Sequence, residues 1–310
     1  MRLYVDIVVP RFILERRRMK ALESGSSGFL GSHLREALLS REWEVVSIPR
    51  ELLYNPDQLI EFVEKEKPDY IYHLAAYGNM SHQKDLAMIV FANLIGTFNL
   101  LNASLRVPYR AFINFGSSSE YGIKGIKMSE TDRLDPNSMY GATKAGATHL
   151  VRAFAKQFDK PTLTVRPFSV YGPGEADYRF IPTVCRSIVT NTPFPLDEHA
   201  THDWVYIQDF TDGVLLATDN INRLSSQVVN IGSGRMHTNR EVCEMLKKVS
   251  GKQYLATPLN GLRNDSSQAV WMSDNSKIAS FGFAPKHMLE EGLRKTFNYF
   301  KSKYESGAKN

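Results

Sequence analysis

The chain has 310 residues, 43% of them hydrophobic, and a formal net charge of +5 at pH 7. Residues 1–18 carry +3 of that charge, so the rest is nearly balanced and does not predict a nucleic-acid-binding face. No apolar run approaches the roughly 20 residues of a membrane span. The two cysteines, Cys185 and Cys243, lack metal-ligand spacing, so we predict no metal site and a reducing, cytoplasmic environment.

The length leaves room for about two lobes after an N-terminal extension at residues 1–18. Asp6 and Pro10 interrupt the apolar part of this extension, and three arginines, Arg16 to Arg18, follow it. A secretory signal has the opposite order, with its positive charge first. The extension is therefore either an added arm, without fixed structure, or upstream sequence before a start at Met19, and we favour the second interpretation.

Short apolar runs predict strands, and segments with helical spacing lie between them. In chain order, strands are predicted at 19–22, 44–48, 70–76, 111–115 and 163–166, with helices at 33–39, 59–65, 85–105 and 140–158. Such alternation predicts an α/β fold with a Rossmann-type, doubly wound parallel sheet and ligands at the carboxyl ends of its strands. Beyond residue 174 the pattern is irregular, with strands at 204–207 and 228–231 and helices at 182–190, 238–249 and 289–304.

Three glycines stand where the first strand turns into the first helix, in the stretch Gly25-Ser-Ser-Gly28-Phe-Leu-Gly31. Backbone N–H groups at such a turn can approach a pyrophosphate at the positive end of the helix. The spacing differs from the usual Gly-x-Gly-x-x-Gly fingerprint. By itself, the motif therefore fits either a phosphate site or a plain glycine-rich turn.

Two further patterns carry possible chemistry. Tyr140 and Lys144 lie four residues apart on one predicted helix face, where a cation favours the phenolate of a tyrosine whose pKa is ordinarily near about 10. Residues 117–122, Ser-Ser-Ser-Glu-Tyr-Gly, follow a predicted strand at its carboxyl end, where a hydroxyl could bind a substrate oxygen. Taken alone, the Tyr140–Lys144 pair is better explained as a plain exposed helix face, and residues 117–122 also fit a serine-rich turn.

Together, the motifs resemble an extended short-chain dehydrogenase/reductase of the nucleotide-sugar epimerase/dehydratase family. The resemblance runs from Met19 to the end and rests on the order of nine pieces. They are Gly25 to Gly31, His73-Leu-Ala-Ala76, Asn93-Leu-Ile-Gly-Thr97, Ser117 to Gly122, Tyr140-x-x-x-Lys144, Arg166 to Gly174, Arg179-Phe-Ile-Pro182, His202-Asp-Trp-Val-Tyr206 and Asn230-Ile-Gly-Ser233.

This resemblance implies roles for particular residues. Tyr140 would be the acid–base group, Lys144 would hold the nicotinamide ribose and lower the pKa of Tyr140, and Ser117 would position the substrate oxygen. The implied cofactor contacts are Gly25, Ser27, Gly28, Phe29, Leu30, Gly31, Leu74, Ala75, Ala76 and Phe168. The implied contacts to a nucleotide sugar are Ser118, Ser169, Arg179, Asp203 and Arg263.

The resemblance also implies a domain organisation and an assembly. A dinucleotide-binding domain would comprise residues 19–172 with about 204–232. A smaller, partly interwoven α/β lobe for the nucleotide sugar would comprise 173–203 and 233–310. The family also implies a homodimer formed through the helices at 85–105 and 140–158.

Departures from the family pattern narrow the reaction. Sugar 4,6-dehydratases have Thr-Asp-Glu or Thr-Ser-Glu where this chain has Ser117 to Ser119, and its carboxylate, Glu120, is displaced by one residue. Neither cysteine falls where fucose-synthase-like epimerisation needs one. We therefore expect reduction of a 4-keto-6-deoxyhexose at C4. The alternatives are a 4-epimerase with retained NAD and a non-catalytic dinucleotide-binding protein, which would be expected to lose Tyr140 or Lys144.

Three other positions bear on the cofactor and the fold. The second strand ends in Ser-Ile-Pro-Arg50 with no acid to bind a ribose 2′-hydroxyl, which favours NADP over NAD unless Arg50 is only a solvated charge. Glu23 falls in the first strand, where a buried carboxylate is costly unless it is paired or protonated. His202 replaces the arginine that usually precedes Asp203 in the family.

Overall fold

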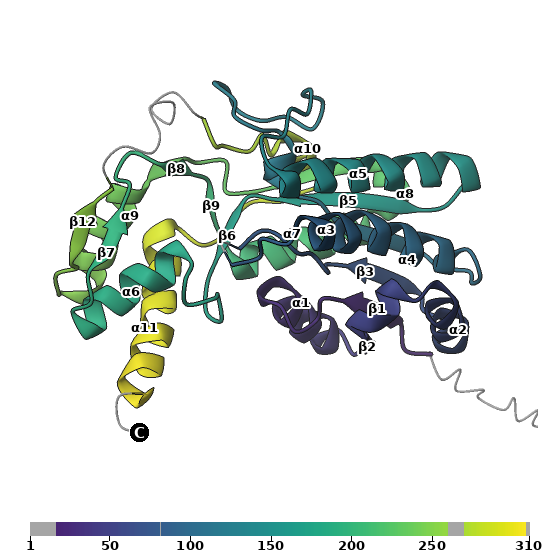
Figure 1. Ribbon diagram of the computed structural model, residues 1–310, viewed down its shortest axis with the longest axis horizontal. Coiled ribbons are helices and arrows are strands. Elements are labelled where there is room, and N and C mark those ends of the chain that lie inside the picture. Colours follow the sequence, from purple (N-terminus) through teal and green to yellow (C-terminus); the bar gives the residue numbers. More distant parts are fainter. Residues whose placement is uncertain (1–16, 81, 260–269, 308–310) are drawn as a thin grey trace, which may run out of the picture.

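A six-stranded parallel sheet forms the centre of the computed structural model, which describes residues 17–80, 82–259 and 270–307 (Figure 1). The strand order is β10-β5-β4-β3-β1-β2, and every neighbouring pair is parallel. The strands are β1 (Lys20–Ser24), β2 (Glu44–Ile48), β3 (Tyr70–His73), β4 (Ala111–Phe115), β5 (Thr162–Pro167) and β10 (Gln227–Ile231). This confirms the predicted Rossmann-type fold.

Helices cover both faces of this sheet. Helices α1 (Phe29–Ser40) and α7 (Ile207–Asp219) pack on one face, and α2 (Pro56–Glu66), α4 (Gly96–Ser104) and α5 (Met139–Phe158) pack on the other. Helix α7 was not predicted, because Thr211, Asp212 and Gly213 are poor helix formers. Its Gly213 lies against Phe283 and Ile231, so close packing on the sheet outweighs local preference there.

The predicted helix at 85–105 is continuous but contains a π-helical turn. It consists of α3 (Leu86–Val90), η2 (Phe91–Ile95) and α4. By length and composition alone it could cross a membrane, which corrects our expectation that no segment approaches that length. Half of it is nevertheless packed in the interior, where Asn93 and Asn99 are buried and hydrogen-bonded, as in a core helix.

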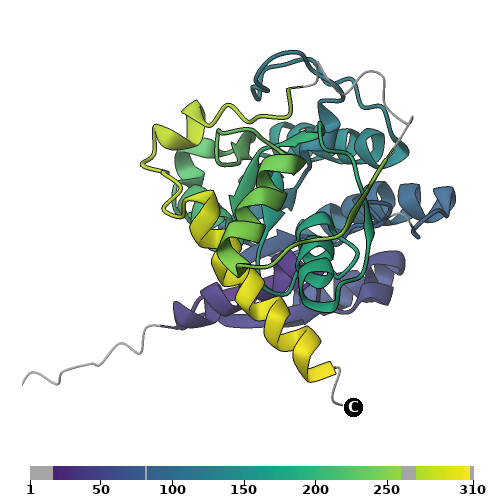
Figure 2. The same cartoon turned by 90° about the vertical axis from the view of Figure 1, so that its left-hand side faces the viewer.

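A second lobe continues from the carboxyl end of the sheet (Figure 1). Three two-stranded sheets pair β6 (Ser169–Tyr171) with β9 (Trp204–Tyr206), β7 (Phe194–Leu196) with β12 (Ala256–Pro258), and β8 (Thr201–His202) with β11 (His237–Thr238). Helix α11 (Leu289–Gly307) crosses α6 (Phe180–Thr190) and α9 (Asn239–Ser250), as Figure 2 shows. One hydrophobic core runs from the α1 face of the large sheet into this lobe.

Shorter elements complete the described residues. They are η1 (Arg50–Tyr54), η3 (Ser118–Glu120), α8 (Ile221–Leu224) and α10 (Ser276–Ala279). Thr238 and Glu241 cap the start of α9 reciprocally and form a capping box. Arg17 and Arg18 are exposed, and the rest of the predicted N-terminal extension lies outside the described residues.

Candidate active site

The glycine loop between β1 and α1 forms a tight cradle. Gly25 has φ +76°, a conformation that side chains rarely adopt, and a Cβ there would lie 2.7 Å from the backbone nitrogen of Ala75. A Cβ on Gly31 would overlap the carbonyl oxygen of Gly25. These glycines therefore let the loop pack tightly against the loop after β3 and the start of α1, where unpaired N–H groups favour an anion. This geometry fits the pyrophosphate of a dinucleotide.

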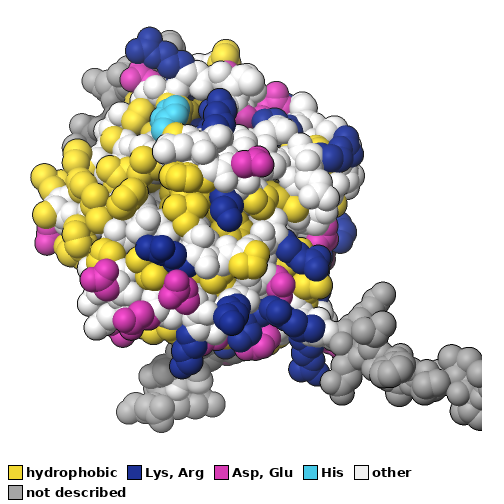
Figure 3. Space-filling view, turned by 90° about the vertical axis from the view of Figure 1, so that its right-hand side faces the viewer, with side chains coloured by type: hydrophobic (Ala, Val, Ile, Leu, Met, Phe, Trp, Pro, Cys, Tyr) yellow, Lys and Arg dark blue, Asp and Glu magenta, His cyan; other side chains and the backbone are white. Residues whose placement is uncertain are grey.

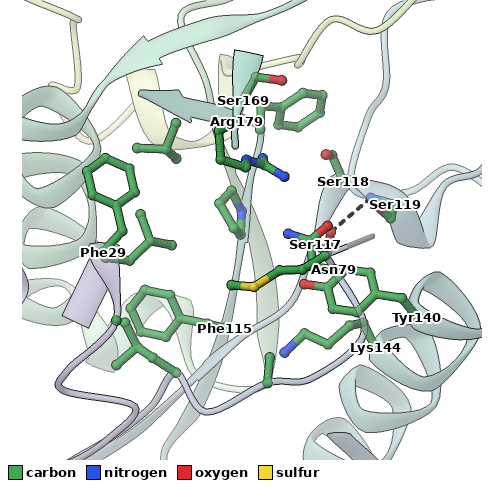
Figure 4. A pocket seen from close by; sticks show the side chains of 18 of the residues that line it. Phe29, Asn79, Phe115, Ser117, Ser118, Ser119, Tyr140, Lys144, Ser169 and Arg179 are labelled. Carbon is green, nitrogen blue, oxygen red and sulfur yellow. Dashed lines mark hydrogen bonds between the residues drawn. The ribbon is translucent and has the colours of Figure 1, made fainter. Parts of the chain in front are cut away.

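A cavity of about 390 Å³ opens from this cradle and reaches the second lobe (Figure 4). Its lining includes fourteen of the residues that the sequence singled out. They are Gly25, Gly28, Phe29, Leu30, Gly31, Leu74, Ala76, Ser117, Ser118, Tyr140, Lys144, Phe168, Ser169 and Arg179. Segments that lie more than 100 residues apart in the sequence thus face one space, which is large enough for a ligand of several rings.

A smaller cavity of about 200 Å³ shares the glycine loop and extends toward the end of β2. Ser27, Arg50 and Ala75 line it, so the remaining predicted cofactor residues lie here. At its edge, the Ser47 hydroxyl accepts hydrogen bonds from Ser26 at 2.8 Å and from Arg35 at 2.7 Å. Two arginines and two hydroxyls therefore surround the end of β2, and none of the described residues lining this cavity is acidic.

Tyr140 and Lys144 project from α5 into the large cavity below Ser117 (Figure 4). Burial raises the pKa of Tyr140 to about 12, Glu120 adds to the rise, and a hydrogen bond with Ser117 and the charge of Arg179 oppose it. We expected Lys144 to lower the Tyr140 pKa. In the protein alone, burial dominates and the net shift of this pKa is upward.

Lys144 is buried in a polar layer under the cavity. Burial lowers the pKa of Lys144 to about 8, against the attraction of Glu120. Next to it, Thr143 accepts a hydrogen bond from Asn93, which also pairs with the backbone of Tyr77. The Asn93 side chain thereby ties the π-helical turn to α5 and to the loop after β3, and π-helical turns are frequent at functional sites.

His73 extends this polar layer toward the glycine loop. Its two ring nitrogens contact the hydroxyls of Ser24 at 2.7 Å and Thr97 at 2.9 Å. Burial, with a smaller contribution from Lys144, lowers the pKa of His73 to about 3. The ring is therefore neutral, and it links β1, β3 and α4 without adding charge beneath the cavity.

The second lobe closes the far end of the cavity with polar groups. Ser169 and Arg179 lie there, and the Ser169 hydroxyl is 3.4 Å from Nδ1 of His202. Glu175, the one carboxylate among the described lining residues, contacts Nε of Arg179 at 3.5 Å. Burial raises the pKa of Glu175 to about 8, so it is largely protonated near neutral pH.

Sequence reasoning missed several lining residues. Asn79 and Met80 follow β3, and Glu175 and Tyr178 follow β6, so their places after strand ends were a signal that could have found them. Trp271 lies next to a segment outside the described residues, and nothing in its sequence neighbourhood marks it. It packs against the small hydrophobic cluster of Tyr121, Met128 and Phe168 and lines the cavity.

One predicted substrate contact, Asp203, does not line the cavity. Asp203 is fully buried and accepts hydrogen bonds from the backbone and side chains of Ser233 and Ser273 and from the backbone of Gly234. Its carboxylate is saturated, so it organises these loops instead of lining the cavity. Arg263 lies outside the described residues.

Glu23 is buried in β1, as its position in the sequence indicated, and a carboxylate is costly there. It is fully buried on the α1 side of β1, and neither carboxylate oxygen has a hydrogen-bond partner. Burial raises the pKa of Glu23 to about 8, and the charge of Arg35 opposes the rise only in part. The side chain is thus protonated and neutral near pH 7, so β1 does not have to bury a charge at this position.

The described residues contain no group of three or more His, Cys, Asp or Glu side chains that could hold a metal ion. The site therefore offers a phenol, an ammonium and hydroxyls beside a cradle for phosphate. Such groups can move a proton to or from a substrate oxygen while a bound dinucleotide exchanges a hydride with the adjoining carbon.

Comparison with known proteins agrees with this geometry. The low-salt glycan biosynthesis protein Agl12 of Haloferax volcanii is 28% identical, covering 91% of this chain and 98% of its own length. A dTDP-glucose 4,6-dehydratase of Haemophilus influenzae is 26% identical, covering 91% and 98%. The UDP-glucuronic acid 4-epimerase of Bacillus cereus, solved with UDP-glucuronic acid and NAD, has a TM-score of 0.84 and 29% identity, covering 92% of this chain and 100% of that one.

The model of the NAD dependent epimerase/dehydratase family matches residues 22–232, more than half of the chain. The matched region contains the glycine loop, Ser117, Tyr140 and Lys144. The chain therefore belongs to the NAD dependent epimerase/dehydratase family, a group of extended short-chain dehydrogenases/reductases.

Proposed function

We propose that this protein is a nucleotide-sugar 4-epimerase that oxidises C4 of the sugar and reduces it again on the other face. The observation that carries the proposal is the convergence of Ser117, Tyr140 and Lys144 on one cavity beside the glycine cradle. The similarity to the Bacillus cereus UDP-glucuronic acid 4-epimerase supports it. From sequence we expected reduction of a 4-ketosugar first, and the comparisons support the epimerase better.

The proposed chemistry assigns each of these residues one task. Tyr140, in its phenolate form, takes the proton of the C4 hydroxyl and returns it to the C4 oxygen once the 4-keto sugar presents its other face. Ser117 hydrogen-bonds that oxygen throughout, and the Lys144 ammonium holds the ribose beside Tyr140. A dinucleotide held in the glycine cradle would supply the hydride acceptor and donor for C4. Ser118, Ser169 and Arg179 are the proposed contacts to the nucleotide sugar, whose phosphates suit an arginine.

A second candidate is reduction of a 4-keto-6-deoxyhexose with NADPH. Arg50 favours it, because this guanidinium lines the small cavity where NAD-dependent enzymes place an acid for the ribose 2′-hydroxyl. A substrate panel separates the two candidates. An epimerase converts UDP-glucuronic acid, UDP-glucose or another nucleotide sugar into its C4 epimer with no net change in dinucleotide. A reductase consumes one NADPH per 4-ketosugar and leaves the 4-hydroxy sugars unchanged.

Arg50 gives a direct test of cofactor choice. We expect Arg50→Ser to weaken NADP binding about 10- to 100-fold, since a hydrogen bond to a charged group contributes about 1.5–3 kcal/mol. NAD affinity should stay within roughly threefold, because NAD has no 2′-phosphate. Calorimetric titration of both dinucleotides into both proteins measures this. An equal loss for NAD and NADP would contradict a role for Arg50 in 2′-phosphate binding.

We further propose a homodimer formed through the α3–α4 helix and α5. The α3–α4 helix exposes four large apolar side chains, those of Leu86, Phe91, Ile95 and Phe98. Figure 3 shows hydrophobic side chains gathered on one flank of the molecule, with Lys and Arg along its lower edge. Exposed apolar patches of this kind mark interfaces.

We also propose a cytoplasmic location, in keeping with the free thiols of Cys185 and Cys243.

Phe98→Glu tests the proposed dimer. Its side chain is 53% exposed in the single chain, so a charge there should leave folding intact. In a dimer the charge would be desolvated, and we expect the dissociation constant to rise at least about 100-fold. Sedimentation velocity over a concentration series measures this, with Ile126→Glu on an exposed loop as the control. A monomeric parent protein, or a dimer unchanged by Phe98→Glu, would contradict the proposed interface.

A further inference from the structure

Glu120 lies directly beneath Ser117, in a place that gives it no contact with a substrate. It is the last residue of the short η3 turn that follows β4, and its side chain is fully buried. Ser117, Ser118 and Ser119 line the large cavity, whereas Glu120 lines neither cavity. Any influence of this carboxylate on the reaction therefore passes through its neighbours.

Four donors converge on the two oxygens of Glu120. Oε1 accepts the backbone N–H of Ser117 at 2.8 Å and the hydroxyl of Thr148 at 3.0 Å. Oε2 accepts two N–H groups of Arg166, each at 2.8 Å. The packing is close, since a Cβ on the preceding Gly116 would overlap Oε1. Four donors leave no lone pair for an acidic proton, so the arrangement accommodates a carboxylate paired with a guanidinium.

Arg166 is itself held from its other side. Its side chain is 3% exposed, its remaining terminal nitrogen donates to the Tyr121 hydroxyl at 2.8 Å, and its guanidinium lies 4.6 Å from the Tyr121 ring centroid. Tyr121 in turn donates to Asn230 on β10 at 2.7 Å. The Glu120–Arg166 pair thus fixes the Ser117 turn to two neighbouring strands of the sheet, as well as to α5 through Thr148.

The Glu120 charge also reaches the two groups on α5 that face it. It raises the pKa of Tyr140 and favours the ammonium form of Lys144, which raises the pKa of that amine. From β5, the guanidinium of Arg166 faces the same carboxylate, and Tyr121 follows it in the chain. Removing only the negative charge should therefore lower the pKa of both Tyr140 and Lys144.

We propose that Glu120 is a positioning residue, which with Arg166 holds the Ser117 turn so that the Ser117 hydroxyl meets Tyr140 and the substrate oxygen. This rests on the proposed function for its catalytic consequence and on the contacts above for its geometry. Glu120, the carboxylate displaced by one residue in the Ser-Ser-Ser-Glu-Tyr-Gly stretch, then holds this turn in place. Small displacements of a catalytic group cost about 100-fold in rate, so loss of the Glu120 contacts should lower the rate measurably.

Glu120→Gln tests the proposal in the full-length protein with NAD or NADP bound. Glutamine keeps an oxygen for Ser117 but places an amide against Arg166. We expect kcat for the nucleotide sugar to fall about 10- to 100-fold with KM within roughly threefold. The limb of the pH–kcat profile set by Tyr140 should move to lower pH. Hydrogen exchange of residues 116–121 should accelerate, with the glycine loop unchanged.

Two further variants provide a second test and a control for this experiment. Thr148→Val removes one donor to Glu120 without altering charge, and we expect kcat about threefold to tenfold lower with faster exchange of residues 116–121. Asp209→Asn alters another buried carboxylate, which binds the backbone of residues 286 and 287, and should leave that exchange unchanged. If Glu120→Gln folds and both its kcat and its exchange match the parent, the proposal is overturned. If Glu120→Gln does not fold, an unchanged Thr148→Val overturns it.

The exchange measurement also separates this proposal from the proposed function. Faster exchange of residues 116–121 in a protein whose parent acts on no nucleotide sugar would support the positioning role while contradicting the assigned activity. A parent that is active, beside a Glu120→Gln variant that exchanges and turns over normally, would contradict the positioning role alone.

Discussion

Tyr140→Phe should lower kcat for the nucleotide sugar by about 10²- to 10⁴-fold, the range expected when one general acid–base group is removed. The phenol lines the cavity and is hydrogen-bonded to Ser117, the residue proposed to bind the C4 oxygen. Phenylalanine keeps the ring, so dinucleotide affinity should stay within roughly threefold, because the glycine cradle is unaltered. Steady-state kinetics and dinucleotide titration together measure the two effects.

Tyr72→Phe is the matched control for that experiment. Tyr72 is fully buried in β3 and its hydroxyl lies 3.4 Å from Thr218, on the face of the sheet that α1 and α7 cover. Removing this hydroxyl should leave kcat unchanged. A Tyr140→Phe protein that is folded, binds dinucleotide and turns over at the rate of the parent would refute the assignment of Tyr140.

Glu23→Val should stabilise the protein by about 2–4 kcal/mol near pH 8 and by less than about 1 kcal/mol near pH 5. The sign follows from the raised pKa of Glu23, about 8 in the folded chain against 4.5 ordinarily. Between those two values the unfolded chain releases a proton that the folded chain keeps. Folding is therefore penalised increasingly as pH rises through this window, and valine removes the penalty.

Urea denaturation of parent and Glu23→Val at pH 5 and pH 8 measures this difference. Glu36→Val, at an exposed position on α1, is the control and should change stability by no more than about 0.5 kcal/mol at either pH. A Glu23→Val protein less stable than the parent at pH 8 would show that the carboxylate has a partner that the protein alone does not contain.

The parallel sheet and its ligand loops were predictable because they follow from local patterns. Short apolar runs marked the β strands, and the glycines marked a turn whose backbone conformation few other residues adopt. The pairing of Tyr140 with Lys144 followed from helical spacing alone. These features depend on neighbours within a few residues, which the sequence displays directly.

What the sequence could not supply depends on burial and on distant contacts. Burial raises the pKa of Tyr140 in the protein alone, an effect that the spacing of Tyr140 and Lys144 does not reveal. Asp203 matched a family motif, yet its hydrogen bonds come from residues 30 and 70 positions away. The role of Glu120 likewise needed Arg166, on another strand, to become visible.

The proposed epimerisation removes a hydride from C4 of a nucleotide sugar and returns it to the same carbon within this cavity. A nucleotide sugar carrying deuterium at C4 tests this step, with the product analysed by NMR and mass spectrometry. We expect interconversion of the two C4 epimers with the deuterium retained at C4. Loss of the deuterium to water during epimerisation would contradict the proposed hydride transfer. A protein that forms no C4 epimer but consumes NADPH when given a 4-ketosugar would contradict the proposed epimerase.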